Sequence, residues 1–481
     1  MSRPKLAVHG HFYQPERRDP FNGEIPPQPA AAPFRDWNAR IDAECYKPNA
    51  ERGNLRHISY DLGPTLAGWL AANDPATHQA FVDSDVTPGV PRGTDDECSD
   101  WHALAQAYHH AILPLASAAD RRTEIRWGVR DFELRFGRRP SGIWLPETAV
   151  DMPTLRSLAD ERIRYTILAP WQAADSRIDT SRPYRVDLGG RRQMAIVYYD
   201  AMLSAAVSFD SGATMNADSF ARDHVLPRLR ESSFPDGTAP LADIATDGEL
   251  YGHHQKFRDL FLARLVNPDA GVADRGFDVT TVGEAICSTP LMTMPLTQVA
   301  ERTSWSCHHG VLRWMAECPD AADGRWKAPL RMAFERLAAA LDVVAAGLAA
   351  DFMDPTALWQ ARDEYVDVIF GAETPDDFAR RWLPLASAAQ HRNFLTLLEA
   401  ERWRLAMFAS DGWFWGDPVR PETKHVMLCA AKACRLIDGA AGTDLEGRLM
   451  DDLALFVSPS RRIDGAGIYA EALADAGQPV A

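Results

Sequence analysis

Short apolar runs alternate with amphipathic stretches through the first two thirds of the chain. Runs of strand length lie at 5–8, 143–145, 165–168, 194–199 and 241–245, each bounded by Gly, Pro or polar residues. Apolar positions at helical spacing lie between them, at 60–72, 121–138, 151–162 and 216–230, and residues 101–119 have helix composition interrupted by Pro114. Strands that alternate with helices of this length predict a parallel sheet.

The pattern changes after Lys327. Apolar residues follow helical spacing from Phe334 to Leu348, further helical stretches lie at 358–370, 379–389, 394–408 and 425–436, and no strand pattern returns. This helical region of about 150 residues has the usual size of a domain. We therefore predict a catalytic barrel over residues 1–325 and an all-α domain over 326–481 that caps the barrel mouth.

An insertion near residues 16–58 interrupts the barrel pattern. Its first part, 16–54, is rich in Pro, Ala, Asp and Arg and has little periodicity. Insertions of this length in compact domains are often functional, and 36–38 and 44–46 offer hydrogen-bonding and stacking groups. A surface flap without a role in ligand binding is the equally open alternative.

Two of the apolar runs end abruptly on carboxylates. Pro146 cannot donate to a strand ladder, so the run 143–145 ends there and delivers Glu147 to its carboxyl end. The run from 241 ends in the same way on Asp247, followed by Gly248 and Glu249. Such positions face the ligand crevice of parallel sheets and barrels, and two carboxylates from different strands are what glycoside cleavage requires. The alternative is that these acids only cap the helices that follow.

The first strand also ends on polar groups, because His9 and His11 follow its apolar residues and Gln14 lies close behind. Each proposed functional group thus follows a strand, which predicts a barrel with its site on one face. The sequence alone does not separate seven strands from eight. Trp305, between two serines, could offer a ring face to a sugar, with burial as the alternative.

Several motifs together resemble glycoside hydrolase family 57. They are His9-Gly-His11-Phe12-Tyr13-Gln14-Pro15, Tyr108 to Leu115, Trp144-Leu145-Pro146-Glu147, Thr246-Asp247-Gly248-Glu249 and Ser410-Asp411-Gly412-Trp413-Phe414-Trp415. The likeness is greatest to an uncharacterised branch with a C-terminal helical region. It implies an α/β fold, an incomplete (β/α)7 barrel followed by the helical domain. Thr148 and Val150 depart from the family's nucleophile motif.

The resemblance also implies residue roles. Glu147 would be the nucleophile and Asp247 the general acid/base of a retaining enzyme, a glycoside hydrolase or a transglycosylase, acting on an α-linked glucan. No cofactor or metal is expected in this chemistry. The residues expected to bind substrate are His9, His11, Gln14, Trp144, Glu249, His253, Trp305, Asp411, Trp413 and Trp415. The two last tryptophans, in a glycine-flanked turn, are predicted to border the barrel mouth.

The composition limits the classes of molecule that the protein is expected to bind. A formal net charge of −16 disfavours nucleic acid and anionic membranes as partners and fits a neutral or cationic one, and 14 tryptophans are a generous supply of stacking surfaces. The seven cysteines form no CxxC pair and are odd in number, which favours reduced thiols over a zinc ribbon or a complete disulfide set. The N-terminus has no apolar leader and no run of about 18 apolar residues occurs, so a cytoplasmic location is expected. The oligomeric state is left open.

Two other functions remain open. One is a metal-dependent polysaccharide hydrolase or deacetylase, with ligands from His9, His11, Asp247, His253 and His254. The other is a catalytically weak glucan-binding protein, which the departures in the nucleophile motif would suit. Hydrolysis, chain transfer and branching are not distinguished by the sequence.

Overall fold

The computed structural model describes residues 3–85, 102–230, 234, 238–268, 275–320 and 323–480. It divides into two compact units. The barrel unit comprises Met1–Gln14, Pro27–Ala107 and Phe132–Trp305, and the helical unit comprises Pro15–Pro26, Tyr108–Asp131 and Ser306–Ala481. The chain thus crosses between the units several times, where the sequence predicted a single boundary at 325/326.

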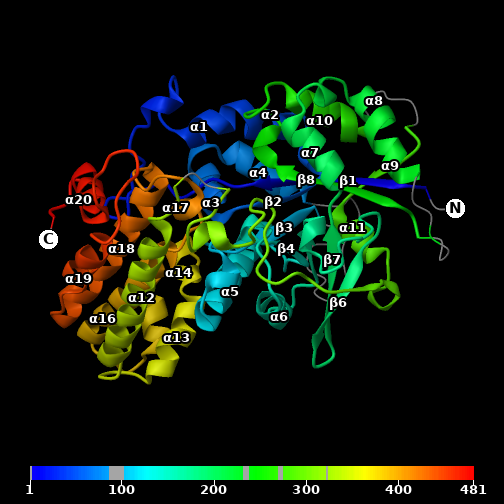
Figure 1. Ribbon diagram of the computed structural model, residues 1–481. Helices are drawn as coiled ribbons and strands as arrows, with labels where there is room; N and C mark the ends of the chain where they lie inside the picture. Colours follow the sequence, from blue (N-terminus) through cyan, green and yellow to red (C-terminus); the bar gives the residue numbers. More distant parts are fainter. Residues whose placement is uncertain are drawn as a thin grey trace. The chain divides into compact units, whose positions relative to one another are not determined.

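One sheet organises the barrel unit (Figure 1). Its strand order is β10-β6-β7-β5-β4-β3-β2-β1-β8, with β9 paired to β1. The strands are β1 Lys5–Phe12, β2 Ser59–Leu62, β3 Ala103–Gln106, β4 Gly142–Trp144, β5 Tyr165–Leu168, β6 Tyr184–Gly189, β7 Arg192–Tyr198, β8 Leu241–Asp247, β9 Asp278–Thr280 and β10 Leu296–Thr297. Every neighbouring pair from β8 through β1, β2, β3, β4 and β5 to β7 is parallel, and β6 pairs antiparallel with β7.

The seven parallel strands form an incomplete barrel. The backbone N–H of Asp200, just after β7, donates to the carbonyl of Asp243 on β8 at 2.7 Å. No ladder joins β7 to β8 within the described residues. The predicted α/β class and incomplete barrel are therefore confirmed, and among the described residues seven of the sheet's ten strands, from β8 to β7, form its continuous parallel part.

Helices follow the strands as the amphipathic pattern predicted. Those that start after a barrel strand are α3 Pro64–Asn73, α5 Ala118–Phe136, α6 Met152–Asp160, α7 Ala201–Phe209 and α10 Arg258–Val266, and the shorter or second helices are α4 Pro75–Ser84, α8 Ala217–Phe220, α9 Leu226–Arg230 and α11 Val282–Cys287. α6 begins where the Asp151 side chain accepts the Thr154 N–H at 2.8 Å, with Pro153 in the first turn. In the insertion, α1 Trp37–Ile41, a π-helical turn Asp42–Tyr46 and α2 Lys47–Glu51 follow one another.

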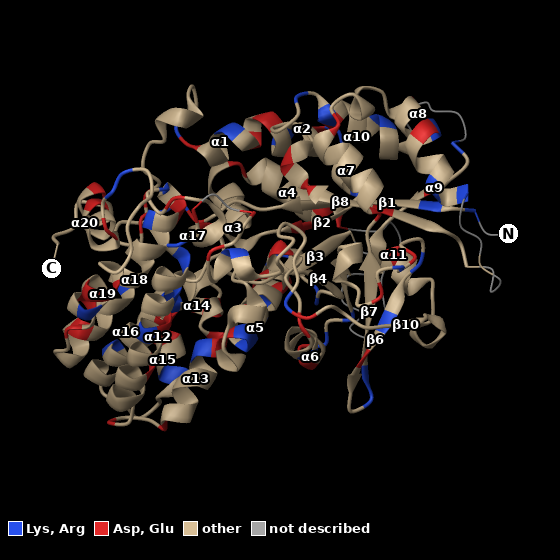
Figure 2. Cartoon of the chain, viewed as in Figure 1, with Lys and Arg blue, Asp and Glu red and all other residues tan. Residues whose placement is uncertain are grey.

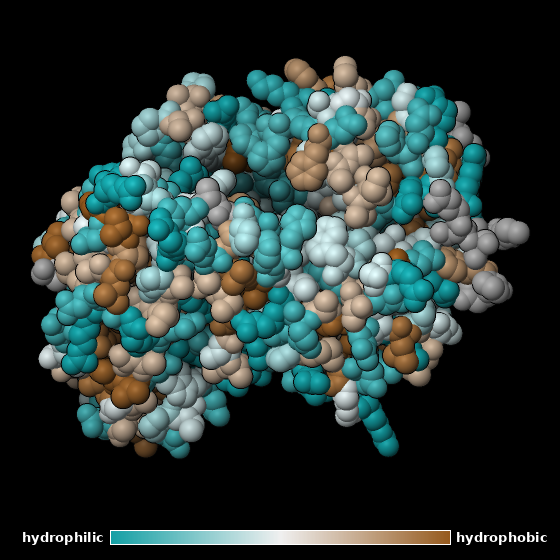
Figure 3. All heavy atoms as spheres, viewed as in Figure 1, coloured by the Kyte–Doolittle hydropathy of each residue, from teal (hydrophilic) through white to brown (hydrophobic). Residues whose placement is uncertain are grey.

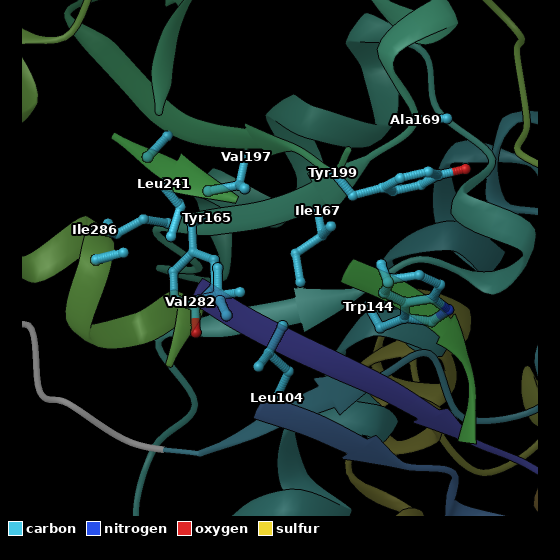
Figure 4. Close-up of a cluster of buried hydrophobic side chains, with 14 of the residues drawn as sticks. Leu104, Trp144, Tyr165, Ile167, Ala169, Val197, Tyr199, Leu241, Val282 and Ile286 are labelled. Atoms are coloured by element: carbon cyan, nitrogen blue, oxygen red, sulfur yellow. The ribbon is translucent and has the colours of Figure 1, made fainter. Parts of the chain in front are cut away.

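Buried side chains from the parallel strands fill the barrel interior (Figure 4). They include Leu104, Trp144, Tyr165, Ile167, Val197, Tyr199 and Leu241. Gly142 lies directly against the Tyr165 ring, where a Cβ would clash, so glycine allows β4 to lie close to the side chain of β5. The interior is thus a packed core, and functional groups can face solvent only at the strand ends.

The helical unit contains α12 Lys327–Ala349, α13 Pro355–Glu364, α14 Val366–Phe370, α15 Pro375–Trp382, α16 Ala388–Ala406, α17 Asp411–Phe414, α18 Pro421–Ala441, α19 Leu445–Leu453 and α20 Gly465–Asp475. No strand lies between 323 and 480, where every residue is described. Lys and Arg intermix with Asp and Glu along α12, α13, α16 and α19 (Figure 2). The predicted all-α region is confirmed.

Apolar side chains lie in small patches among hydrophilic ones on the face seen in Figure 3. None of the described helices combines the length and apolarity that a membrane crossing requires. Five cysteines are free thiols, but Cys287 is disulfide-bonded, so the expectation of reduced thiols throughout is wrong.

Two helix predictions are wrong. Residues 103–106 form β3 rather than a helix, although Ala and Leu favour helices, because β2 and β4 supply a ladder on each side. Trp101, the first residue of that predicted helix, lies outside the described residues. Residues 60–62 belong to β2, and the helix expected from 60 begins at Pro64.

Candidate active site

Two histidines and an aspartate meet at the carboxyl ends of β1 and β2. The parallel register places His11 beside Asp61, and residues two apart on a strand face the same side. His9 Nε2 donates to Asp61 Oδ1 at 3.0 Å and His11 Nδ1 to Asp61 Oδ2 at 2.8 Å, while Gln106 of β3 donates to the same Oδ2 at 2.9 Å. One buried carboxylate therefore orients both histidines.

The two histidines carry different charges. Burial lowers the pKa of His9 below its ordinary value, more than Asp61 raises it. Burial acts in the same direction on His11, but the charge and hydrogen bond of Asp61, together with Asp247 and Glu249, raise the pKa of His11 to about 9. At neutral pH, His9 is neutral and His11 is an imidazolium among carboxylates.

The Trp144 ring packs against both histidines. Its ring stacks on His9 at 4.7 Å and on His11 at 5.2 Å between centroids, and the residue has 0% exposure. Trp305 meets Trp144 edge-on at 5.0 Å. Trp144 thus supports the histidines from the core, whereas the half-buried Trp305 keeps part of its ring accessible.

Glu147 lies in the short turn Pro146–Thr148 that ends β4. Its backbone has φ 55° and ψ 22°, a left-handed conformation that costs a non-glycine residue about 1–3 kcal/mol. The surroundings hold this conformation: Trp305 donates its backbone N–H to the Glu147 carbonyl at 3.1 Å and its indole Nε1–H to Glu147 Oε2 at 3.2 Å. Thr148 and Gln172 exchange two hydrogen bonds of 2.8 Å. Hydrogen bonds therefore hold both the backbone and the side chain of Glu147, the residue predicted to be the nucleophile.

Asp247 and Glu249 follow one another at the end of β8. Asp247 pairs with His11 in the parallel register and is exposed. Glu249 is buried and accepts hydrogen bonds from the Tyr46 hydroxyl at 2.6 Å and the Gln14 amide at 3.5 Å. Burial and the charge of Asp247 raise the pKa of Glu249 to about 7. The two neighbouring acids thus differ in exposure. Such a difference can separate the pKa values of two carboxyl groups, so that one keeps its proton while the other is ionised.

The insertion contributes directly to this site. Besides Tyr46, its Glu44 accepts a 2.6 Å hydrogen bond from His253 Nδ1, and the Cys45 thiol donates to the Gly248 carbonyl at 3.4 Å. Gly252 has φ +149° and lies against the Glu44 carbonyl, where a Cβ would clash. These contacts favour the functional interpretation of the insertion over a flap. Glu44 thereby engages His253, as Asp61 engages His9 and His11. The metal-hydrolase alternative also named His254 and Asp247.

The remaining expected residues lie in the helical unit. Trp413 is 1% exposed and packs against Phe334 at 5.7 Å and Phe408 at 6.4 Å, so its ring has no free face for a sugar. Trp415 is 42% exposed, with the Arg420 guanidinium 4.4 Å from its ring centroid. Asp411 begins α17. For Trp415 and Asp411, substrate binding stays a prediction.

Sequence reasoning missed Asp61 and Trp171. Trp171 is 47% exposed, donates its Nε1–H to the Ser304 carbonyl at 2.9 Å and meets Tyr199 edge-on at 6.1 Å. A signal existed: Pro170-Trp171-Gln172 follows β5 as Pro146-Glu147-Thr148 follows β4, and both form short 3₁₀ turns. A polar residue near the end of a short buried run was the corresponding signal for Asp61.

Comparison with known proteins gives three results. The family model described as glycosyl hydrolase family 57 matches residues 102–294, and a domain of unknown function, DUF3536, matches 323–477. A search of curated protein sequences found no match. Among solved structures, an exo-type maltose-forming amylase from a Pyrococcus species has 16% identity and a TM-score of 0.74, covering 93% of this chain and 82% of its own.

Two further solved structures are similar. A GH57-type branching enzyme from Pyrococcus horikoshii has 15% identity and a TM-score of 0.63, with 93% of this chain and 94% of that chain covered. A 4-alpha-glucanotransferase from Thermococcus litoralis has 15% identity and a TM-score of 0.56, with 90% of this chain and 60% of that chain covered. At these identities the likeness establishes the fold. The family match over residues 102–294 supports the resemblance of the barrel unit to glycosyl hydrolase family 57.

Proposed function

We propose that this protein is a retaining enzyme that cleaves or rearranges an α-linked glucan by double displacement. The observation that carries the proposal is the fixed position of Glu147 at the end of β4. Trp305 links this carboxylate to the cluster of Trp144 and His11, and His11 interacts in turn with the charge of Asp247. Ring contacts and a hydrogen bond thus connect Glu147 to His11, and an electrostatic interaction connects His11 to Asp247.

In the first step, Glu147 attacks the anomeric carbon while Asp247 donates its proton to the departing glycosidic oxygen. The Trp305 indole N–H bonds one carboxylate oxygen of Glu147, which keeps the nucleophile from rotating. In the second step, Asp247 takes the proton from a water molecule or a sugar hydroxyl, whose oxygen bonds to the anomeric carbon as the bond to Glu147 breaks. Water gives hydrolysis, and a sugar hydroxyl gives transfer.

The substrate class rests on the structural relatives. Their printed names describe a maltose-forming amylase, a branching enzyme and a 4-alpha-glucanotransferase. Aromatic rings at Trp305 and Trp171, both near Tyr199, would provide stacking faces for glucose rings. An oligosaccharide or polysaccharide is therefore the proposed substrate.

The test is incubation with maltoheptaose, with analysis of product lengths, linkages and the anomer released first. We expect the α-anomer, with shorter chains alone for hydrolysis, both shorter and longer chains for transfer, and new branch linkages for branching. Glu147→Gln should abolish turnover without unfolding, because an amide keeps the volume but cannot form the glycosyl intermediate. Glu51→Gln, an exposed glutamate in the same unit, is the matched control and should retain full activity.

Three results would overturn the proposal. Release of the β-anomer would indicate inversion, and near-normal activity of Glu147→Gln would remove the nucleophile. Binding of maltoheptaose without any turnover by the unaltered protein would favour the glucan-binding alternative.

A further inference from the structure

Two short loops of the helical unit bring four metal-binding side chains together. Cys307 and His309 come from the first loop and Cys318 and Asp320 from the second, so the pattern is Cys-x-His and Cys-x-Asp. One ligand atom from each residue lies within 4.8 Å of the other three. This is the only such group of three or more His, Cys, Asp or Glu side chains among the described residues. We call these four residues the loop cluster.

The distances fit a tetrahedral zinc site. Zinc bonds of about 2.3 Å to sulfur, 2.0–2.1 Å to nitrogen and 2.0–2.2 Å to oxygen place the ligand atoms of a tetrahedron about 3.3–3.8 Å apart. His309 Nδ1 lies 3.6 Å from Cys318 Sγ and 3.3 Å from Asp320 Oδ2, which match the about 3.6 Å and about 3.4 Å of such a tetrahedron. The Cys307 and Cys318 sulfurs are 3.3 Å apart, closer than the about 3.8 Å of two zinc-bound sulfurs. A sulfur separation of 3.3 Å is far longer than the roughly 2.05 Å of a disulfide.

Hydrogen-bond donors surround the proposed ligands. The backbone N–H groups of His309 and Arg313 donate to the Cys307 sulfur, and the His308 N–H donates to Asp320 Oδ2 at 2.9 Å. Hydrogen bonds of this kind orient metal ligands from outside the coordination shell. Two thiolates, one carboxylate and one zinc ion leave a net charge of −1. The buried Lys327 ammonium, which interacts electrostatically with both sulfurs, offsets that charge.

The two loops that carry these residues have little regular structure, so a bound ion could stabilise them. Between β10 and α12 the described residues contain one regular element, the 3₁₀ turn Leu312–Trp314. Gly324 lies against the backbone of Glu317 and Cys318, where a Cβ would crowd the second loop. A four-ligand site would cross-link two loops that few backbone ladders hold, and closed four-ligand sites are typical of structural zinc.

We propose that Cys307, His309, Cys318 and Asp320 bind one structural zinc ion that cross-links these loops. The site lies within the helical unit and is separate from the chemistry at Glu147 and Asp247. Metal content is measured without substrate, so failure of the zinc proposal and failure of the proposed enzyme activity are distinguished by separate measurements.

The test is elemental analysis of the full-length protein, purified without chelator, followed by exchange with Co²⁺. We expect about one zinc ion per chain, and a cobalt form with thiolate charge-transfer bands and the intense visible bands of tetrahedral Co²⁺. Cys307→Ser and His309→Ala should each lose most of the metal. His308→Ala is the matched control. The His308 ring lies 3.4 Å from Asp320 Oδ2, but its side chain is 95% exposed and is not one of the four proposed ligands, so this variant should keep the metal. Cys429→Ser controls for the loss of a buried thiol elsewhere in the same unit.

If Cys307→Ser does not fold, His309→Ala and Asp320→Asn decide the matter, since both replace residues at the exposed side of the cluster. Three results would overturn the proposal: a protein without zinc that also takes up no Co²⁺, equal metal content in His309→Ala and His308→Ala, or a Cys307–Cys318 disulfide in the protein as purified. A bound metal that survives Cys307→Ser, His309→Ala and Asp320→Asn alike would overturn it as well.

Discussion

The histidines and acids at the carboxyl ends of the barrel strands form one site, the barrel site, and the loop cluster forms another. Both contain histidine and aspartate, but strands position the first set and irregular loops carry the second. In the barrel, two histidines bind one aspartate, and the register of β1 with β2 fixes all three before any ligand binds. In the loop cluster, histidine and aspartate lie near two cysteines on loops that have little regular structure of their own. Strands can therefore preorganise chemistry, whereas loops need a cross-link to hold a comparable arrangement.

The largest effect is expected at the acid of the barrel. Asp247→Asn should lower turnover of maltooligosaccharides by about 10²–10⁴-fold, because the leaving sugar then departs without a proton. Aryl glycosides with good leaving groups should lose much less in the first step. Added azide should restore their turnover, since it attacks the intermediate without a general base. Equal losses on both substrates would show that Asp247 has a structural role instead of donating a proton. The barrel site would then lack its proposed general acid.

The second prediction compares two aspartates directly. Asp61→Ala leaves the charged His11 buried without its partner, and breaking a buried ion pair in this way costs about 3–5 kcal/mol of stability. Urea unfolding followed by tryptophan fluorescence measures the loss, and Asp61→Asn should lose less because it keeps a hydrogen-bonding side chain.

Asp320→Asn should behave differently, because Asp320 lies at an exposed side of the loop cluster. We expect no change in the unfolding of metal-free protein and a lower midpoint only in zinc-loaded protein. A strong effect in the metal-free protein would mean that the loops are preorganised, as the barrel is.

The third prediction concerns Asp243, which lies four residues before Asp247 on the same face of β8. Neither of its carboxyl oxygens has a hydrogen-bond partner among the described residues, and burial together with the charge of Asp200 raises the pKa of Asp243 to about 8. The folded state therefore holds a proton that the unfolded state releases near pH 4. Asp243 should lower the free energy of unfolding by about 1.4 kcal/mol per pH unit as the pH rises from about 4 to about 8.

Asp243→Asn removes this contribution, so the stability of the variant relative to the unaltered protein should increase across the same pH range. Urea titrations at several pH values give the difference. A difference that does not change with pH would show that Asp243 is ionised in the folded barrel.

The sequence predicted the site residues at clearly marked strand ends better than those on short strands or irregular loops. Glu147 and Asp247 could be located because proline and glycine end their strands within a few residues, a signal that is local in sequence. Asp61 was missed because β2 has only four residues and merges with the helical pattern that follows. The loop cluster was missed because its ligand pairs have one-residue spacing and no periodic element marks them. Trp413 and Trp415 share one glycine-flanked turn, and only packing decides which ring is buried.

The smallest effect is expected at Trp171, which tests whether the end of β5 contributes to the site in the same way as the end of β4. Trp171→Ala should lower kcat/KM for maltoheptaose about 5-fold, the equivalent of about 1 kcal/mol of stacking, and should change kcat/KM for maltotriose less. The reason is that a stacking face away from the reacting bond binds only chains long enough to reach it. Phe209→Ala, which removes an aromatic ring that is 89% exposed, is the control and should change neither value. Trp415→Ala in the same assay tests the expectation for the helical unit. Equal losses on both chain lengths for Trp171→Ala would mean that this ring supports Tyr199 and Trp305 instead of binding sugar.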